Sequence, residues 1–473
     1  MKVFLCFSLA VLLFVFGDWF LGRLVILDGQ LFHRDDTVLV LEKGLPEQVE
    51  RLGEFTNLYW LDLQSTGITP EEYEAVRQAA GKARILWALS FQGKPVDART
   101  PTLEIRQLTD ADAALLEHLP RLNTILAEDC RDYPQLLLLK RRHPDWDIRC
   151  RVKLGEGFIG PRETYAAPEG CTEEELRLAL SLLPRLKRVD LRGTGLSAMQ
   201  ARSLSQDHPW VRFLWNEQLG DIIFPTNARE IDLSGVLLEG TEELEALLPY
   251  LPETEKIILC DCGLSSEVLA ELGQRHPEIR FVWRVKLGPL SARTDDTWFA
   301  PITKRQLIGG TDADELKYCV DMECIDLGHC WIRDCEWARF MPKLRYLVLA
   351  DTYVRDLSPL SGLKELAYLE LFVTPVKDYS PLLGCTGLED LNLGYTYGDP
   401  TPISRMTWLK NLWWGGIHYV PQVGNETPAA MLQHGLPETK IMLYAGSSTG
   451  MGWRNLPHYY EMRDIIGMYY MTG

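Results

Sequence analysis

Leucines recur at a nearly constant step in the C-terminal part of the chain. Apolar residues hold the first, fourth and sixth places of each segment, as Leu344, Leu347 and Leu349 do. Consecutive segments lie 22, 22, 22 and 21 residues apart, and they begin at Met322, Leu344, Leu366, Leu388 and Leu409. A fixed step of this size is typical of a repeat protein in which each repeat forms one coil of a stack.

The fourth and sixth places predict a short strand in every coil. Side chains on a strand alternate with period two, so these two places share one face. A single strand of this kind buries only one face and cannot close a core alone. We therefore expect stacked coils, with the leucines inside and the third, fifth and seventh places on the opposite face.

Two further markers keep the same step. The ninth place holds a small polar residue that can satisfy backbone groups where the strand turns away: Cys330, Thr352, Thr374 and Thr396. A few residues later comes a Ser-Pro or Thr-Pro pair, at Ser358-Pro359, Ser380-Pro381 and Thr401-Pro402. Proline suits the first position of a short turn or 3-10 segment, so we predict such turns on the outer side of these coils.

The combined pattern, LxxLxLxx(T/C)x(V/I) with a 22-residue step, resembles the leucine-rich repeat family in its short, internalin-like class. The resemblance implies an α/β solenoid, curved as a horseshoe, with a parallel sheet on its concave side and helices or 3-10 turns outside. The family accepts Cys, Thr or Asn at the ninth place, which is why we assign that place a structural role.

A longer form of the repeat precedes this region. Its units begin at Leu58, Leu122, Leu186 and Thr254, and the steps up to Met322 are 64, 64, 68 and 68 residues. Capping signals such as Thr69-Pro70-Glu71-Glu72 predict true helices between the strands. We expect two or three coils per unit, with the ninth place of the first coil occupied by Thr66, Cys130, Thr194 and Cys262.

These patterns divide the chain into five predicted parts. Residues 1–17 form a signal peptide or N-terminal anchor, and residues 18–57 form an N-terminal cap. Residues 58–321 carry the long repeats, residues 322–414 the 22-residue repeats, and residues 415–473 a C-terminal cap. The Trp-, Tyr- and Met-rich tail after Gly450 has a second interpretation, as a docking segment for a partner or a membrane.

The N-terminus decides the expected location of the protein. Lys2 is followed by an apolar run from Val3 to Phe16, which is shorter than the roughly 20 residues that span a bilayer. The run fits the apolar part of a secretory signal. An uncleaved anchor continuing through Trp19, Phe20 and Leu21 and a buried terminal element are the alternatives. We therefore expect a secreted or cell-surface protein that contacts a membrane only through this segment, if it is uncleaved.

Charge and missing motifs narrow the function. The net charge of −17, from 66 acidic and 49 basic residues, argues against a nucleic-acid partner. The sequence has no HExxH, GxxxxGK(S/T), GxSxG or EF-hand pattern, so we predict a non-enzymatic protein without a cofactor. His143, His208 and His276 precede prolines at predicted helix ends, where we assign them a structural role.

One group of cysteine and histidine residues could form a metal site. Cysteine and histidine gather between residues 319 and 335, at Cys319, Cys324, His329, Cys330 and Cys335. Their spacing is not a repeated CxxC pair, and the ninth place already explains Cys330, so we predict no metal.

The candidate binding site is the concave face of the 22-residue repeats. Aromatic anchors with a polar rim are typical of binding hot spots, and the face combines Tyr346, Tyr368, Phe372, Tyr395 and Trp413 with Asp326, Glu370, Asp390 and Asn392. Aromatic residues that merely cover one another in a sheet are the alternative. We predict a recognition scaffold whose ligand is a protein. A glycan is the second possibility and an enzyme with a site grafted on the solenoid the third.

Overall fold

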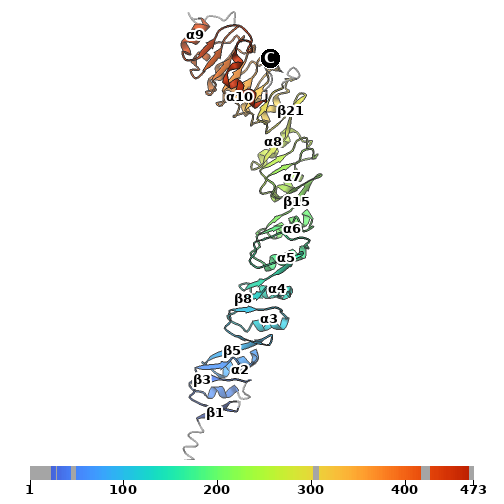
Figure 1. Ribbon diagram of the computed structural model, residues 1–473, viewed down its shortest axis with the longest axis vertical. Coiled ribbons are helices and arrows are strands. Elements are labelled where there is room, and N and C mark those ends of the chain that lie inside the picture. The colour runs from blue at the N-terminus through green and yellow to red at the C-terminus, as the bar shows by residue number, and fades with distance from the viewer. Residues whose placement is uncertain (1–22, 28, 44–48, 302–307, 417–426, 468–473) are drawn as a thin grey trace, which may run out of the picture. The chain divides into compact units, whose positions relative to one another are not determined.

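The structure is a computed structural model that describes residues 23–27, 29–43, 49–301, 308–416 and 427–467. The chain packs into two compact units, Met1–Trp215 and Asn216–Gly473, which are described separately. Figure 1 shows the order of their elements along the chain. The predicted signal segment, residues 1–17, lies outside the described residues.

The second unit ends in a seven-stranded parallel sheet. Its strands stand side by side in chain order: β22 (Trp298–Phe299), β24 (Cys324–Asp326), β26 (Tyr346–Val348), β27 (Tyr368–Glu370), β28 (Asp390–Asn392), β29 (Asn411–Trp413) and β30 (Lys440–Met442). The register places Leu347 beside Leu369 and Leu369 beside Leu391. One step of the sequence repeat is therefore one coil of the stack.

Short 3-10 helices cross the outer side of these coils. They are η4 (Asp314–Tyr318), η5 (Glu336–Phe340), η6 (Ser358–Leu360), η7 (Ser380–Gly384) and η8 (Ile403–Arg405). Aspartate caps the turns: Asp356 Oδ1 accepts from the backbone N–H of Ser358 at 2.8 Å, and Asp378 does the same for Ser380 at 2.8 Å. The Ser-Pro pairs thus begin turns rather than long helices.

The leucines of the repeat fill the space between the sheet and the outer turns. Leu347, Leu369 and Leu391 are fully buried, and they belong to one continuous core that runs from Leu219 to Leu436. Residues at the third and fifth places form a separate apolar cluster on the opposite face of the sheet, which includes Tyr346, Val348, Tyr368 and Trp413. The alternation of a strand separates the two sets.

Ninth-place hydroxyls tie the end of each strand. Thr352, Thr374 and Thr396 donate to the carbonyls of the sixth-place leucines at 2.8, 2.5 and 2.6 Å. Thr66 and Thr194 make the same bond at 2.7 Å in the long repeats. Each bond satisfies a buried carbonyl where the chain leaves the sheet, which is costly to leave unpaired.

Every long repeat has the same order of elements: strand, helix, strand, hairpin, strand and outer helix or 3-10 turn. The first strands are β4 (Trp60–Leu63), β8 (Thr124–Ala127), β13 (Arg188–Asp190) and β18 (Lys256–Ile258), and the helices that follow are α2 (Pro70–Ala79), α4 (Tyr133–Arg142), α6 (Ala198–Asp207) and α8 (Ser266–Arg275). The second strands are β5 (Arg84–Phe91), β9 (Asp147–Cys150), β14 (Arg212–Leu214) and β19 (Arg280–Val282). The third strands are β7 (Thr102–Glu104), β12 (Tyr165–Ala166), β17 (Glu230–Asp232) and β22. The outer helices that follow the third strands are α3 (Asp110–Leu116), α5 (Glu173–Leu182) and α7 (Glu242–Leu247), which continues as η2 (Leu248–Tyr250). Three coils per unit follow from this order.

The expected continuous parallel sheet does not extend through the long repeats. In the described residues before β22, parallel pairing is confined to separate groups of three strands, β3-β4-β5, β7-β8-β9, β12-β13-β14 and β17-β18-β19. An antiparallel hairpin follows each second strand and separates one group from the next. The hairpins pair β5 with β6 (Lys94–Asp97), β10 (Val152–Leu154) with β11 (Gly157–Ile159), β15 (Asn216–Leu219) with β16 (Ile222–Pro225), and β20 (Arg284–Leu287) with β21 (Leu290–Arg293).

Glycine makes these hairpins possible. Gly155, Gly220 and Gly288 follow the last residue of the first hairpin strand, and their φ angles are +62°, +57° and +60°. A two-residue hairpin turn needs positive φ at its first central position, where glycine has no steric penalty. The recurring Leu-Gly pairs of the sequence are therefore the turns of hairpins.

The two ends of the chain add further elements. The N-terminal region holds the hairpin of β1 (Leu24–Leu27) and β2 (Gln30–His33), then β3 (Val38–Val40) and η1 (Val49–Glu54). The C-terminal region holds α9 (Pro428–Gly435), β30, η9 (Trp453–Asn455) and α10 (Pro457–Ile465). In the part of the chain that the structure describes, no helix is both long and apolar enough to cross a membrane.

Candidate functional site

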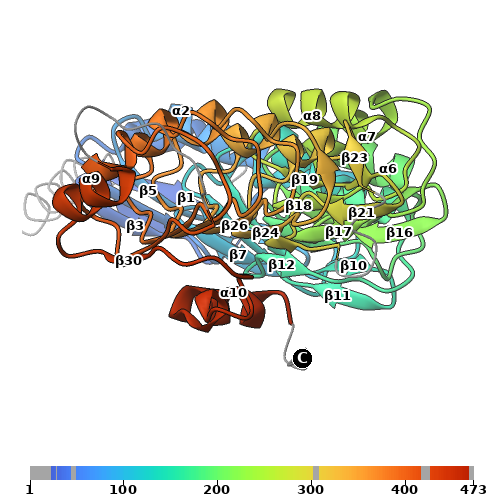
Figure 2. The same ribbon diagram turned by 90° about the horizontal axis from the view of Figure 1, so that it is seen from above.

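The C-terminal tail lies across one face of the seven-stranded sheet. This face carries the third- and fifth-place side chains of the 22-residue repeats, and we call it the strand face. We call residues 453–466, which form η9 and α10, the tail segment. Figure 2 shows α10 on the side of the C-terminal sheet opposite α7 and α8. Trp453, Tyr459, Met462 and Ile466 of the segment pack in one cluster with residues of the strand face. The segment therefore occupies the face that we expected to bind a ligand.

Trp453 is the centre of this contact. Its side chain is fully buried, and its Nε1–H donates to the hydroxyl of Tyr368 at 2.8 Å. The Tyr368 hydroxyl in turn donates to Oε2 of Glu370 at 2.9 Å. The indole also lies 6.2 Å from the Trp413 ring, centroid to centroid. Burial and the adjacent Glu370 carboxylate raise the pKa of Tyr368 well above its usual range, so the phenol stays protonated as a donor.

Glu370 is a fully buried carboxylate, and its ionic partner comes from the tail segment. Arg454 Nη2 lies 3.5 Å from Glu370 Oε1, and the side chain of Glu370 has no exposed surface. A charge in such a position is expensive unless it is paired. Burial is the largest single effect on Arg454 and opposes its charge. The combined attraction of Glu370 and of the nearby Tyr459, Tyr368 and Asp326 outweighs burial and leaves the pKa of the guanidinium above its usual value.

A second ionic contact joins α10 to β28. His458 Nδ1 lies 2.9 Å from Asp390 Oδ2, and His458 Nε2 lies 3.6 Å from Glu389 Oε2. Asn411 Nδ2 donates to the other oxygen of Asp390 at 2.7 Å. The hydrogen bond to Asp390 raises the pKa of His458, and the charge of Glu389 acts in the same direction. The imidazolium form therefore fits this position best.

Tyr346 contacts the middle of α10. Its hydroxyl hydrogen-bonds to a carboxylate oxygen of Glu461, and Arg345 Nη2 lies 3.8 Å from the same carboxylate. Burial, together with the Glu461 hydrogen bond, raises the pKa of the Tyr346 phenol. Tyr346, Tyr368 and Trp413 are thus all on one side of the sheet and all in contact with the tail or the residues that lead to it.

The remaining aromatic residues of the predicted site lie beside Trp413. The Phe372 ring is 5.8 Å from the Trp413 ring and 5.2 Å from the Tyr395 ring. Trp413 Nε1 donates to the carbonyl of Tyr444 at 3.1 Å, and the N–H of Gly446 donates to the Tyr395 hydroxyl at 3.1 Å. The connection between β30 and η9 therefore covers this end of the face.

Two of the predicted polar residues have a local structural role. Asp326 Oδ1 accepts from the N–H of Gly328 at 3.0 Å, and Asn392 Oδ1 accepts from the N–H of Gly394 at 2.9 Å. In the long repeats the fifth place makes the same bond to the seventh, for example from Asp232 to Ser234 at 2.9 Å. Aspartate or asparagine at this place therefore fixes the strand end in both the long and the 22-residue repeats.

The nine predicted site residues are thus brought together, but they are not open to solvent. Seven of them are buried, and Phe372 and Tyr395 are partly buried: the buried set is Asp326, Tyr346, Tyr368, Glu370, Asp390, Asn392 and Trp413. Their partners come from the tail segment, and these four residues were not predicted from the sequence: Trp453, Arg454, His458 and Glu461. The aromatic richness of the tail was the available signal, and it pointed to a cap or a docking segment without placing it.

A second set of aromatic side chains is open to solvent. Trp331 and Tyr353 occupy the tenth place of two successive coils, and Tyr397 occupies it two coils after Tyr353; each of the three is 56% exposed. We call these three residues the outer ladder. Exposed Arg333, Arg355 and Lys377 follow them at the twelfth place. A hollow of about 820 Å³ lies at one end, lined by Trp331, Tyr353, Arg333, Asp334 and residues 309–312.

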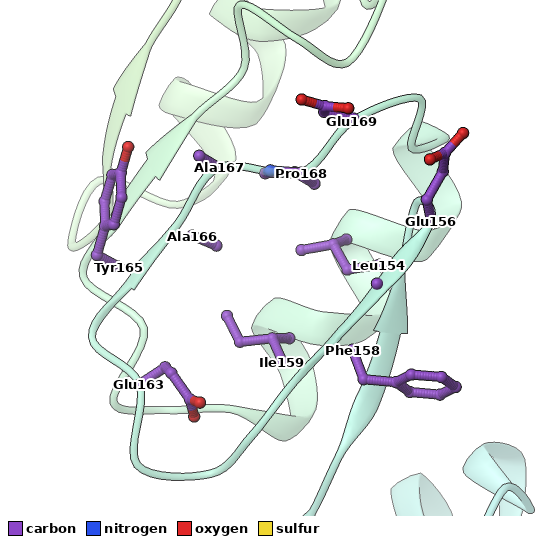
Figure 3. Close-up of a pocket in the computed structure, with 11 residues that line it drawn as sticks. Leu154, Glu156, Phe158, Ile159, Glu163, Tyr165, Ala166, Ala167, Pro168 and Glu169 are labelled. Atoms are coloured by element: carbon purple, nitrogen blue, oxygen red, sulfur yellow. The ribbon is translucent and has the colours of Figure 1, made fainter.

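A further hollow of about 460 Å³ lies in the first unit, between the hairpin β10–β11 and β12. In Figure 3, Leu154 and Ile159 point toward Ala166 and Pro168, whereas Phe158 points away. Glu163 and Glu169 lie at its rim without a basic residue among the lining side chains. No set of converging polar groups is present in this lining, so we assign it no ligand.

The cysteines considered for a metal site are buried in the coils. Cys319, Cys335 and Cys385 point their sulfurs at backbone carbonyls, at 3.6, 3.5 and 3.1 Å. Burial raises the pKa of Cys319 to about 12 and that of Cys385 to about 12, so both remain thiols. Within the described ranges, no group of three or more His, Cys, Asp and Glu side chains is arranged to hold a metal ion.

The histidines that recur in the long repeats cap the C-terminal ends of helices. His143, His208 and His276 are the C-cap residues of α4, α6 and α8, and their N–H groups bond to the carbonyls of Leu139, Leu204 and Leu272. His143 lies 2.9 Å from Glu117 and His276 lies 3.0 Å from Glu245. These contacts give the histidines a structural function at the ends of the helices.

Comparisons with known proteins give neighbours by fold only. No protein-family model and no curated protein sequence matches the chain. An internalin, InlF, of Listeria monocytogenes is 11% identical over 89% of this chain and 91% of its own, with a TM-score of 0.25. Internalin C2 of Listeria monocytogenes is 19% identical over 28% of this chain and 68% of its own, with a TM-score of 0.21. A leucine-rich repeat protein of Leptospira interrogans is 12% identical over 85% of this chain and 93% of its own, with a TM-score of 0.21.

TM-scores of this size establish no common overall shape, so the assignment depends on the repeats of the chain itself. Residues 322–414 form coils at a 22-residue step, each with a short parallel strand and buried leucines. The outer side of each coil carries a 3-10 turn. These coils have the leucine-rich repeat fold.

Proposed function

We propose that the chain is a non-enzymatic recognition scaffold that binds a protein ligand through the strand face of its 22-residue repeats. In this proposal the face is the concave side of a horseshoe-shaped solenoid, and the protein is exported or displayed at a cell surface. The fold alone does not fix a function, so the proposal depends on the site.

One observation carries the proposal. The strand face already binds a polypeptide, because the tail segment is held there by an indole, a guanidinium, an imidazole and a carboxylate, each with its own partner. Buried aromatic anchors surrounded by directed polar contacts are characteristic of protein-binding hot spots. A face with these groups is chemically suited to a peptide or a protein helix.

The burial of the strand face determines which substitutions can test this proposal. Tyr368 and Trp413 are fully buried, so replacing either with alanine costs about 3 to 5 kcal/mol and does not leave the fold intact. A substitution in the tail is the better choice. Arg454→Glu places a second acid beside Glu370 and opens the face without removing any residue of the sheet.

The experiment pans a random peptide library against three forms of the full chain: wild type, Arg454→Glu and Arg405→Glu. Arg405 is exposed on η8 and serves as the charge-matched control on the outer side. We expect the Arg454→Glu form to enrich a peptide consensus that the Arg405→Glu form does not. Equal enrichment on both variants, or none on either, would remove the strand face as the recognition site.

Glycan binding is the second candidate, and the outer ladder favours it. Trp331 and Tyr353 expose their rings beside a hollow lined by a cation and carboxylates, a combination that suits a sugar ring and its hydroxyls. A glycan array tests it with Trp331→Ala and Tyr353→Ala. Trp210→Ala is the control, because Trp210 is a comparably exposed tryptophan of the first unit.

A further inference from the structure

We infer that the strand face is specific for a short helix carrying cationic and aromatic side chains, and that the tail segment is a displaceable internal occupant of this site. The inference rests on the proposed function and names the class of partner. The partner presents an aromatic residue and an adjacent arginine before the helix, and a second cation at the start of the helix, as Trp453, Arg454 and His458 do in the tail segment.

The charges of the face define this class. Its acids are Glu370, Asp390 and the neighbouring Glu389, while the tail brings Arg454 and His458 to meet them. Because Glu370 has no exposed surface, a ligand that lacks a cation at this point leaves a buried charge unpaired. An acidic or uncharged helix is thereby rejected.

The tail segment does not close the leucine core at the end of the stack, which would be the work of a structural cap. That core is closed by α9 and β30, where Leu432 and Leu436 are buried among the core leucines. The tail instead covers the opposite face, which carries its own apolar cluster with Tyr346 and Tyr368.

Among the described residues, one other strand face with charged side chains has no such cover. In the sheet β12-β13-β14, the third-place residues Arg188 and Arg212 are exposed to solvent. The fold therefore does not require a helix over this face. The aromatic and acidic side chains of the 22-residue repeats are what allow a helix to pack on this face.

Two features of the tail segment favour its release from the strand face: its helix is short, and the residues before it are exposed. Its helix α10 has nine residues, and a helix of this length is marginal in water unless it is packed. The preceding residues Leu443, Tyr444 and Met451 are exposed, and Thr449 and Gly450 lie at the surface. A tethered occupant competes through its high effective concentration, so an external helix binds well only after the tail has left.

The test separates the tail from the rest of the full chain. A specific protease site is inserted after Thr449, and the folded protein is cut there. A fluorescent peptide with the sequence of residues 450–467 then serves as the probe, and its binding is measured by anisotropy before and after the cut. Peptides with Arg454→Glu and with Tyr460→Ala are compared, because Tyr460 is 48% exposed and makes a matched control.

We expect the cut protein to exchange its tail for the probe and to bind it at least tenfold more tightly than the uncut protein. The Arg454→Glu peptide loses at least tenfold in affinity, and the Tyr460→Ala peptide binds as the parent does. Circular dichroism shows a folded repeat region throughout.

Two outcomes overturn the inference. If the cut tail remains bound and never exchanges, or if the repeats unfold once it leaves, the segment is a permanent part of the fold. Failure here is distinct from failure of the proposed function. A library consensus on the Arg454→Glu protein that contains no cation would keep the recognition role and remove this class of partner.

Discussion

The most unusual residues of the repeat are those at its eighth place. His329, Asp351, Val373 and Tyr395 have φ angles of +62°, +54°, +61° and +58°. Side chains other than glycine, asparagine and aspartate adopt this left-handed region only at a cost, and a β-branched residue is the least suited to it. The 22-residue coil demands the conformation because the strand must turn sharply before the ninth-place threonine.

Val373 offers a direct measurement of this cost. We expect Val373→Asn to stabilise the protein by about 1 kcal/mol, because asparagine tolerates the left-handed region. The free energy of unfolding in urea is the measurement. Val320 is also exposed but has an ordinary φ, so Val320→Asn gives no such gain. Equal effects at both positions would mean that the backbone conformation is not the cause.

His208 differs from the other helix-closing histidines in its surroundings. Among the described residues, neither of its ring nitrogens has a hydrogen-bond partner. Arg177 lies near His208 and precedes it by 31 positions, which is the number of positions by which Glu245 precedes His276. An arginine therefore stands near His208 where a glutamate stands near His276. Burial, with a further contribution from Arg177, lowers the pKa of His208.

This lowered pKa predicts acid sensitivity. The unfolded chain takes up the proton at an ordinary pKa of about 6.5, before the folded chain does, so stability falls as the pH drops below that value. We expect His208→Gln to reduce the loss of stability between pH 7 and pH 5, as measured by urea unfolding at each pH. His118→Gln, at an exposed position, is the control for the exchange of histidine for glutamine itself.

At the scale of elements, the hairpins show which parts of the fold require glycine. Gly155 and Gly170 have nearly the same φ, +62° and +61°, but different surroundings. A Cβ at Gly155 would overlap the carbonyl oxygen of Glu169, whereas a Cβ at Gly170 would meet nothing within 4 Å. The pair therefore separates conformational strain from overlap.

We expect Gly170→Ala to cost about 1 kcal/mol, the strain of the left-handed region alone. Gly155→Ala should cost about 1 to 3 kcal/mol more, because the chain must also move to relieve the overlap. Urea unfolding of the two variants checks this difference. Equal losses would show that the hairpin β10–β11 moves freely against the loop at Glu169.

The pH dependence of tail docking follows from His458. This imidazole faces Asp390 and Glu389 on the sheet and Glu461 on its own helix, and its pKa is raised. A raised pKa in the docked state means that docking is strongest at low pH and weakens as the pH rises through the folded pKa of His458. We expect faster hydrogen exchange of α10 amides at pH 8 than at pH 6, beyond the intrinsic change in rate. His458→Gln removes this difference, and an unchanged difference in the variant would place the titrating group elsewhere.

The sequence could predict those features that depend on local pattern. The leucines at places four and six, the Ser-Pro turns and the outer helices follow from periodicity and capping, and the structure contains them. The hairpins after each second strand were not predicted, because a Leu-Gly pair between apolar runs has the same appearance inside a loop. The tail could not be placed, because nothing local links Trp453 to Tyr368, a contact that spans 85 positions.

At the scale of the whole molecule, the chain is a series of coils whose contacts are mostly with the next coil. Stability in such a protein is approximately a sum of coil stabilities and neighbour interactions. The tail segment is the exception, since Tyr346 and Glu461 are joined across 115 positions. It couples the coils from β24 to β29 to the end of the chain, whereas the first unit is a separate compact unit.

This organisation predicts local effects of core substitutions. Leu61, in the first unit, and Leu369, beneath the tail segment, are both fully buried. We expect each leucine-to-alanine change to cost about 2 to 5 kcal/mol in its own region. Hydrogen exchange with mass spectrometry should show Leu61→Ala loosening β4 and α2 while α10 keeps its protection. Leu369→Ala should instead loosen β27 together with α10, since the tail rests on that coil. Loss of protection at α10 in the Leu61→Ala variant would show that the two units unfold as one, and the description as a sum of neighbouring coils would then fail.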